Sequence, residues 1–408
     1  MMKIVIIGGG FGGLACAQQL GGSNHEVLLI DRRNYHLFQP LLYQVATGAL
    51  SPADIAEPIR KILKKHGNIS VIMAEVTGID AETRSVRIEN GTAYRYDVLV
   101  LATGSQYAYF GHDAWVDQAP GLKTVDNART HRSRLLEAFE QAERNAIPDE
   151  QRRLMTSVVI GGGPTGVEMA GAIAELGRWT LAGEFRNIDP SQARVILIEG
   201  GAGILAQFPD DLVRYSSDAL ARLGVDVRTS TRVLDIQTDG VLTDQGFIPA
   251  GIVVWGAGVT ATPAARWLGI ETDRSGRIPV DDRLCVKGRP DVYALGDIAL
   301  LLQDGAALPG LAQVAKQQGQ YLGRALRHGG SPDDFPAFRF HNRGNTAVIG
   351  RHAAIFDFGR FHLKGRVAWF LWALVHVYLL VGFEKRALVS MQWLWRYFTK
   401  ARGVRIIR

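Results

Sequence analysis

The sequence is poor in cysteine. Cys16 and Cys285 are the two cysteines among 408 residues, and neither has a second cysteine nearby in the chain. A disulfide framework and a redox-active C-x-x-C pair are therefore excluded. Two isolated thiols also fit a reducing compartment.

Long apolar runs are scarce as well. The first one, residues 4–7, is much shorter than the apolar region of a signal peptide and ends in a glycine cluster. Residues 367–383 form a run of 17 residues broken by His376, whereas a bilayer span takes about 20 residues. We therefore expect a protein that stays on the cytoplasmic side and has no spanning helix.

Acidic residues are missing from the end of the chain. Residues 385–408 contain seven Lys or Arg and no Asp or Glu. This segment alone accounts for the net charge of +6 of the whole chain. Such a tail fits either nucleic acid or anionic lipid. Residues 386–400 project as an amphipathic helix, which favours a membrane surface, and nothing else points to nucleic acid. A buried helix in the core or at a homodimer interface is the alternative, and both can hold together.

The predicted helix has one apolar face and one polar face. The apolar face consists of Ala387, Leu388, Met391, Leu394, Trp395 and Phe398, and the polar face of Arg386, Gln392, Arg396, Thr399 and Lys400.

Glycine, in contrast, is abundant, with 46 residues. Residues 8–13, Gly-Gly-Gly-Phe-Gly-Gly, contain G-x-G-x-x-G between a predicted strand at 3–7 and a predicted helix at 11–20. The glycines allow a tight turn and close approach of a pyrophosphate, and the helix N-terminus offers it free N–H groups. Asp31 ends the next predicted strand, where a carboxylate accepts hydrogen bonds from ribose hydroxyls.

The same motif returns at residues 161–166, between a predicted strand at 157–160 and a predicted helix at 164–182. Glu199 ends the following strand, 33 residues after the motif instead of the roughly 20 usually found. A carboxylate there binds ribose hydroxyls and repels a 2′-phosphate. No arginine occurs in residues 200–213 to offset it, so NADH is favoured over NADPH.

Strand, glycine turn and helix occurring twice indicate an α/β protein with two Rossmann-like dinucleotide-binding domains. A strand at 292–295 and a helix at 311–327 add a further FAD-type element, so we expect the second domain to be inserted in the first. Residues 36–66 are predicted to be helical and irregular, and residues 140–153 to be a surface connection. The expected domains are 1–120 and 266–340 for FAD, 121–265 for NADH, and 341–408 for membrane docking or oligomerisation.

Two shorter motifs complete the pattern. Ala102-Thr103-Gly104-Ser105 follows a predicted strand, and Gly296-Asp297 follows another. The order G-x-G-x-x-G, ATG, G-x-G-x-x-G, GD resembles the two-dinucleotide-binding-domain flavoproteins. In that family the Asp of the GD pair, here Asp297, holds the flavin ribityl chain.

The resemblance narrows to the type II NADH dehydrogenases. Residues 35–50 are similar to the stretch that follows the ribose acid in that family. Residues 312–319, AQVAKQQG, match its AQxAxQxG quinone-site motif at every fixed position, and residues 369–407 are similar to its membrane-docking tail. The family more often has Glu where this chain has Asp31, a change that leaves the ribose contact intact.

This resemblance implies an NADH:quinone oxidoreductase that does not pump protons and docks on the cytoplasmic face of the plasma membrane. A hydride passes from NADH to non-covalent FAD, and two electrons then pass to a membrane quinone. Gln313, Lys316 and Gln317 share one helix face, so we assign them to the quinone site; a solvated polar face is the alternative. Glu168, the Glu of GxGxxGxE, is assigned a proton-relay or NADH-positioning role.

The residues expected to bind the cofactors lie in these motifs or beside them, and no metal site is expected. They are Gly8, Gly10, Phe11, Gly12, Gly13, Asp31, Arg32, Thr47, Val76, Thr103, Gly104, Gly161, Gly163, Thr165, Gly166, Glu168, Glu199, Gly258, Gly296, Asp297, Ala312 and Gln313.

Three other functions share part of this pattern. A sulfide:quinone oxidoreductase needs a cysteine pair at the flavin, which this chain lacks. A soluble NADH-dependent reductase of the ferredoxin-reductase type would lack the AQxAxQxG octet and the amphipathic tail. A non-catalytic redox-sensing flavoprotein differs from an enzyme by its lack of steady NADH turnover. The physiological quinone and the oligomeric state, including a homodimer, stay open.

Overall fold

The computed structural model describes residues 1–328, 336–380, 383–399 and 402–407. The chain divides into two compact units. Unit 1 comprises Met1–Leu37, Ala56–Gln106 and Val259–Arg343, and unit 2 comprises Phe38–Ile55, Tyr107–Gly258 and Gly344–Arg408. Residues 38–55, which we expected within the FAD-binding domain, thus belong to unit 2.

Unit 1 is built on a six-stranded sheet of order β20-β21-β9-β1-β2-β5, which runs parallel from β21 to β5. Residues 4–7 of β1 are buried because the strand has neighbours on both edges and is covered on both faces. The predicted strands at 3–7 and 26–30 are confirmed. The strands are β1 (Lys3–Ile7), β2 (Glu26–Asp31), β5 (Ile69–Met73), β9 (Val98–Leu101), β20 (Cys285–Val286) and β21 (Arg289–Ala294).

The other elements of unit 1 are mostly short. The helices are α1 (Phe11–Leu20), α4 (Ile59–Leu63), α9 (Ala312–Arg327) and the 3-10 turns η5 (Pro263–Leu268) and η6 (Gly296–Ile298). The smaller strands are β3 (Tyr35–Leu37), β4 (Ala56–Pro58), β6 (Val76–Asp80), β7 (Ser85–Ile88), β8 (Ala93–Arg95), β18 (Val259–Ala261), β19 (Ile278–Pro279), β22 (Ala299–Leu300), β23 (Leu302–Gln303) and β24 (Ala306–Ala307); β10 (Ser105–Tyr107) reaches the unit boundary.

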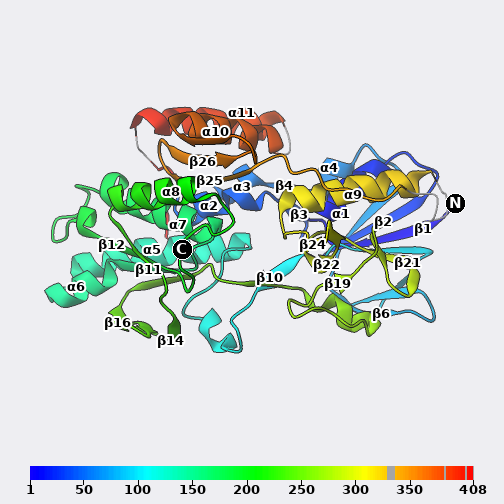
Figure 1. Ribbon diagram of the computed structural model, residues 1–408, viewed down its shortest axis with the longest axis horizontal. Coiled ribbons are helices and arrows are strands. Elements are labelled where there is room, and N and C mark those ends of the chain that lie inside the picture. Colours follow the sequence, from blue (N-terminus) through cyan, green and yellow to red (C-terminus); the bar gives the residue numbers. More distant parts are fainter. Residues whose placement is uncertain (329–335, 381–382, 400–401, 408) are drawn as a thin grey trace. The chain divides into compact units, whose positions relative to one another are not determined.

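Helices α1 and α9 lie against each other in unit 1 (Figure 1). Glycine makes this approach possible. A Cβ added to Gly319 would lie 2.1 Å from the carbonyl oxygen of Gly12, and one added to Gly323 would lie 2.6 Å from that of Cys16. The predicted helices at 11–20 and 311–327 are therefore confirmed, and the last glycine of the octet serves their packing.

Unit 2 contains a four-stranded parallel sheet of order β13-β12-β11-β17. This order corresponds to β5-β2-β1-β9 of unit 1. In each sheet the strand before the fingerprint, β11 or β1, lies between the two strands that follow it in the same order. The strands are β11 (Thr156–Ile160), β12 (Arg194–Ile198), β13 (Val225–Arg228) and β17 (Ile252–Trp255), with a second sheet of β14 (Val233–Gln237), β15 (Gly240–Thr243) and β16 (Gly246–Pro249).

The helices of unit 2 correct two predictions. Residues 140–153 are mostly exposed, as expected, but they are largely helical: α5 ends at Arg144, and α6 begins at Pro148, whose ring suits the first helical position. The predicted helix at 164–182 is α7 followed by the π-helical turn η3. The helices are α2 (Leu42–Ala46), α3 (Pro52–Ile55), α5 (Val125–Arg144), α6 (Pro148–Leu154), α7 (Pro164–Glu175), η3 (Leu176–Thr180) and α8 (Asp210–Arg222), with 3-10 turns η1 (Gln39–Leu41), η2 (Asp113–Val116) and η4 (Pro190–Gln192).

The end of the chain adds a small antiparallel sheet of β25 (Asn345–Gly350), β26 (Ala353–Asp357) and β27 (His362–Gly365), followed by helices α10 (Arg366–Leu379) and α11 (Phe383–Thr399) (Figure 1). Among the residues that the structure describes, no helix has the length and apolar character to span a bilayer. Lys400 lies outside the described residues, and so do the side chains of Arg396 and Phe398.

Candidate functional site

The first fingerprint forms the turn between β1 and α1. Gly8 has a φ of +105°, and a Cβ there would lie 2.3 Å from the carbonyl oxygen of Ala102. A Cβ on Gly13 would lie 1.9 Å from the oxygen of Gly8. Gly10, the N-cap of α1, has open space around its Cβ position, and no side chain caps the helix. The loop is thus packed on its protein side and open at the helix N-terminus, which fits a pyrophosphate.

The acid after the fingerprint is fixed by backbone N–H groups. Gly9 N donates to Asp31 Oδ2 at 2.6 Å, and Arg33 N donates to Oδ1 at 2.7 Å. On the other side of the loop, His36 Nδ1 lies 3.0 Å from the Gly9 oxygen, and burial lowers the pKa of this imidazole. Because a carboxylate accepts about four hydrogen bonds, Asp31 keeps capacity for ribose hydroxyls.

The ATG and GD motifs are joined by hydrogen bonds in unit 1. Ser105 Oγ donates to Asp297 Oδ2 at 2.5 Å. Gly296 has a φ of +75°, and its N–H donates to Gln318 Oε1 of α9 at 2.7 Å. Thr103 Oγ1 lies 2.5 Å from Thr262 Oγ1. These turns are therefore fixed by hydrogen bonds within unit 1.

The second fingerprint repeats the first. Gly161 has a φ of +106°, and a Cβ there would lie 2.7 Å from Ala257 N. A Cβ on Gly166 would lie 1.8 Å from the oxygen of Gly161. Gly163, the N-cap of α7, again has open space around its Cβ position and no capping side chain. Unit 2 therefore presents a second open helix N-terminus that fits a pyrophosphate.

Glu199 is placed as Asp31 is. Gly162 N donates to Glu199 Oε2 at 2.6 Å, and Gly201 N donates to Oε1 at 2.7 Å. The long spacing noted in the sequence is therefore compatible with contact between the acid and the glycine loop. The same carboxylate orders the loop and stays available to a ribose.

The octet forms the first two turns of α9, and its side chains differ in exposure and in their hydrogen bonds. Lys316 is exposed, whereas Ala315 and Gln318 are buried against unit 1. Gln317 Nε2 donates to the His341 oxygen at 2.9 Å, and Gln317 Oε1 accepts from His341 N at 3.1 Å. Gln313 Oε1 accepts from Arg343 N at 3.2 Å. Both glutamines thus bind the backbone of residues 341–343, which the sequence pattern did not predict.

The remaining expected residues are scattered. Val76 is buried in the core of unit 1, Arg32 is exposed, and Gly258 has a φ of +69° in unit 2. Thr47 also lies in unit 2, and its buried hydroxyl donates to the Tyr43 oxygen at 2.9 Å. The Thr47 hydroxyl is therefore used within the protein.

Unit 2 contains a pocket that is partly open to solvent, with about 820 Å³ of empty space when the open part is included. Its walls come from α2, α7, η3, β25, α10, α11 and the last residues of the chain. It is lined by Tyr43, Gln44, Thr47, Ala49, Glu168, Ala172, Glu175, Trp179, Thr180, Val348, Ile349, Gly350, Arg351, Trp369, Trp372, Trp393 and Arg402.

Glu168 is the pocket carboxyl that we expected to be functional. Burial raises its pKa to about 8, and a long contact from Val348 N, 3.4 Å from Oε1, only partly opposes this rise. The carboxyl is therefore mostly neutral at pH 7 and able to donate a proton. Groups with a pKa near the working pH are the ones suited to proton transfer.

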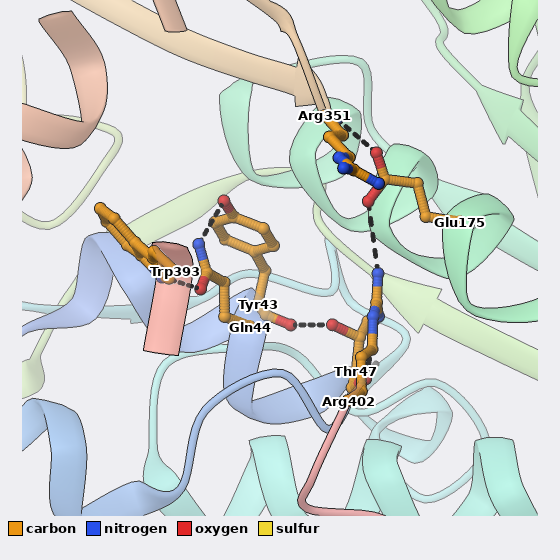
Figure 2. Close-up of polar contacts among 7 residues, drawn as sticks. All are labelled: Tyr43, Gln44, Thr47, Glu175, Arg351, Trp393 and Arg402. Carbon is orange, nitrogen blue, oxygen red and sulfur yellow. Dashed lines mark hydrogen bonds and ion pairs between the residues drawn. The ribbon is translucent and has the colours of Figure 1, made fainter. Parts of the chain in front are cut away.

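Figure 2 shows a second polar group in the same pocket. Glu175 Oε1 accepts from the backbone N–H of Arg351, and Arg402 Nη2 lies 3.4 Å from Glu175 Oε2. Burial raises the pKa of Glu175, while Arg402 and Arg351 counter the rise. On the other wall, Gln44 donates to the Tyr43 hydroxyl at 3.0 Å.

Sequence reasoning missed Tyr43, Glu175 and Arg402. One signal was present for Glu175, because it follows Glu168 by seven residues on a predicted helix and so lies two turns further along the same side. Tyr43 and Arg402 carry no such signal, since they reach the pocket from segments far apart in the sequence.

The comparisons with known proteins agree with these motifs. The family model described as pyridine nucleotide-disulphide oxidoreductase matches residues 2–319. The type II NADH:quinone oxidoreductase Ndh of Mycobacterium tuberculosis is 38% identical, over 98% of this chain and 89% of the relative. NdhA of the same organism is 39% identical, over 98% and 88%.

A solved structure, NDH2 from Plasmodium falciparum in complex with NADH, has the same fold, with a TM-score of 0.90 at 22% identity and 99% coverage of both chains. Fold, motifs and full-length relatives therefore lead to one assignment. The chain belongs to the pyridine nucleotide-disulphide oxidoreductase family and, within it, to the type II NADH:quinone oxidoreductases.

Proposed function

We propose that the protein oxidises NADH and reduces a membrane quinone through FAD, without pumping protons. The observation that carries this function is the presence of two complete dinucleotide fingerprints, each with an open helix N-terminus and a backbone-bound acid. The full-length relatives carry the same activity in their names. FAD, when bound, accepts a hydride and passes on two electrons.

Unit 1 supplies the residues that fit FAD. The N-terminus of α1 faces the pyrophosphate position, Asp31 is oriented for the ribose, and Asp297 is held by Ser105 where the resemblance places the ribityl chain. Unit 2 supplies the corresponding residues for NADH, with the N-terminus of α7 and Glu199 in these roles.

For quinone reduction we assign the octet glutamines and Glu168. Gln313 and Gln317 order residues 341–343 and offer amide groups that can bind quinone carbonyls. The reaction consumes protons, and Glu168 has the pKa of a group that delivers one near neutral pH. Its place on the helix that begins at the second fingerprint also suits a role in positioning NADH.

We further propose that helices α10 and α11 dock the protein on one leaflet, at the cytoplasmic face of the plasma membrane. Large apolar side chains on them are strongly exposed, with Leu374 at 68%, Leu394 at 62% and Trp395 at 67%. Such a patch is characteristic of an interaction surface. Met391 and Leu388 extend it, so these members of the predicted apolar face of α11 are turned to solvent.

Basic charge contributes less to this docking than the sequence indicates. Arg402 is buried beside Glu175, and Arg405 lies 2.5 Å from Glu184. Lys385 donates to the Ala53 oxygen at 2.5 Å. Because these cations have partners within the protein, apolar burial is the larger part of the membrane affinity.

The test of the function is steady-state oxidation of NADH by the purified flavoprotein with a short-chain quinone. We expect many turnovers per flavin, and flavin reduction by NADH that precedes quinone reduction. Flavin that NADH reduces and no quinone reoxidises would favour a redox sensor or a reductase of protein acceptors instead.

A further inference from the structure

The chain does not end at the apolar helices. After α11, residues 402–407 lie beside the end of α2, and Figure 2 shows Arg402 next to Thr47. Val404 N donates to the Gly48 oxygen at 3.2 Å. Gly48 has a φ of +70°, and a Cβ there would lie 2.7 Å from the Val404 oxygen. This close backbone contact requires glycine on the α2 side.

Arg402 is the buried residue of this segment, with 8% of its surface exposed. Its Nη1 donates to the Thr47 oxygen at 2.9 Å, and its Nη2 lies 3.4 Å from Glu175 Oε2. Thr47 is the C-cap of α2, and Glu175 is the last residue of α7. One guanidinium therefore ties together the ends of two helices that line the pocket.

We propose that Arg402 is a positioning residue for quinone reduction, because it ties α2 to α7. Helix α2 brings Tyr43 and Gln44 to the pocket, and α7 brings Glu168. This inference rests on the proposed function for the role of Glu168. Arg402 acts through Thr47 and Glu175 and takes no part in the chemistry itself.

A planar guanidinium suits this role better than another cation. It offers several donors in a fixed arrangement, so it binds a carbonyl and a carboxylate at once. Gln44 then continues the connection on the α2 side, because its Oε1 accepts from Trp393 Nε1 of α11 at 2.9 Å. The position of α2 in the pocket is thus set by Trp393 within α11 and by Arg402 after it.

The proton affinity of Glu168 depends on the charged residues that share its pocket. The titratable and charged residues that line the pocket with it are Tyr43, Glu175, Arg351 and Arg402. Burial raises the pKa of both carboxyls, but Arg402 and Arg351 oppose the rise at Glu175, whereas the Val348 N–H opposes it at Glu168. Glu175 is therefore the carboxyl held by cations, and Glu168 is the one left to exchange a proton.

The experiment compares Arg402→Gln and Arg402→Lys with Arg405→Gln in the full-length flavoprotein. Arg405 is the matched control, because it lies in the same segment and binds Glu184 at the surface and the backbone oxygen of Arg402, whereas the Arg402 side chain binds Thr47 and Glu175. We expect Arg402→Gln to lower NADH:quinone turnover at least fivefold while flavin reduction by NADH changes less than twofold. Arg402→Lys keeps the charge but loses the planar pair of donors, so its turnover should stay well below wild type. Arg405→Gln should stay within twofold of wild type.

A double variant separates positioning from simple charge balance. Glu175→Gln with Arg402→Gln removes both charges but leaves Thr47 without its donor. We expect its turnover to stay low across the pH range. Recovery of wild-type turnover and pH profile in the double variant would show that Arg402 only neutralises Glu175, and would overturn the proposal.

Hydrogen–deuterium exchange supplies a readout that does not depend on quinone. The backbone N–H groups of residues 47–50 bond to Tyr43, Gln44 and Val45 at the end of α2, so Arg402→Gln should speed their exchange while Arg405→Gln leaves it unchanged. Unchanged exchange in Arg402→Gln, or unfolding of every Arg402 variant, refutes a positioning role. If Arg402→Gln speeds the exchange but the wild-type protein reduces no quinone, the proposed function is refuted instead.

Discussion

Replacing Glu168 with Gln should make the protein more stable and less active at the same time. Burial raises the pKa of Glu168 from 4.5 to about 8, so folding keeps a proton on this carboxyl that the unfolded chain releases above pH 4.5. Stability linked to this group is complete below pH 4.5 and is lost as the pH rises towards 8, by about 1.4 kcal/mol per pH unit.

The full loss between these pH values would be roughly 5 kcal/mol. Part of the Glu168 side chain is open to solvent, and solvent screening reduces such contributions, so we expect about 2–3 kcal/mol at pH 8. Glutamine has a similar shape and does not titrate. The variant should therefore match the wild type at pH 4.5 and exceed its melting temperature increasingly up to pH 8.

The activity should change in the opposite direction. A side chain that transfers a proton typically accelerates a reaction by a factor on the order of 10²–10⁴. Water at the pocket mouth can deliver the proton instead, which makes the loss smaller. We expect quinone turnover to fall at least about tenfold in Glu168→Gln, while stopped-flow reduction of the flavin by NADH stays near wild type. Glu184→Gln, at the surface ion pair with Arg405, is the matched control.

The two measurements are made on one protein preparation, with flavin content checked first. A melting temperature that drops by the same amount at every pH would show that Glu168 is an ordinary structural carboxylate. Unchanged quinone turnover would remove it from the proton path, and an equal loss in both half-reactions would assign it to NADH positioning.

Three further results follow from the site. Gln317→Ala should lower quinone turnover more than flavin reduction by NADH, and equal loss in both would assign Gln317 to the fold through its bonds to His341. The ratio of kcat/KM for NADH over NADPH should be at least about ten, because Glu199 repels a 2′-phosphate; equal values would mean that Glu199 does not contact the ribose. Met391→Glu with Leu394→Glu should move the protein to the soluble fraction with NADH oxidation retained, since both side chains are exposed. Continued sedimentation with membranes would contradict docking through α11.

Much of the fold could be predicted because its signals are local. The strands before both fingerprints and the helices after them were confirmed, since three or four consecutive apolar residues followed by glycines have few other structures. The helix at Pro148 was missed for the opposite reason. Its composition is charged throughout, and only the proline at its first turn and the acid-to-base order along it mark it as a helix.

The pocket could not be predicted, because its members come from segments that no local pattern connects. Tyr43, Glu168, Trp372 and Arg402 lie on α2, α7, α10 and the last segment of the chain. A buried arginine in a basic tail looks like any other arginine in sequence. Its pairing with Glu175 is identified only from the structure, in which residues 402–407 lie beside α2 and α7.

The octet shows why a family motif is not a list of ligand contacts. Gly319 is fixed because a Cβ there would lie 2.1 Å from the Gly12 oxygen, and Ala315 because it is packed beside Gly296. Gln313 and Gln317 hold residues 341–343. Substitutions at Gly319 should therefore disturb α1 and the FAD loop first, so loss of flavin, and not loss of quinone affinity, is the expected consequence of Gly319→Ala.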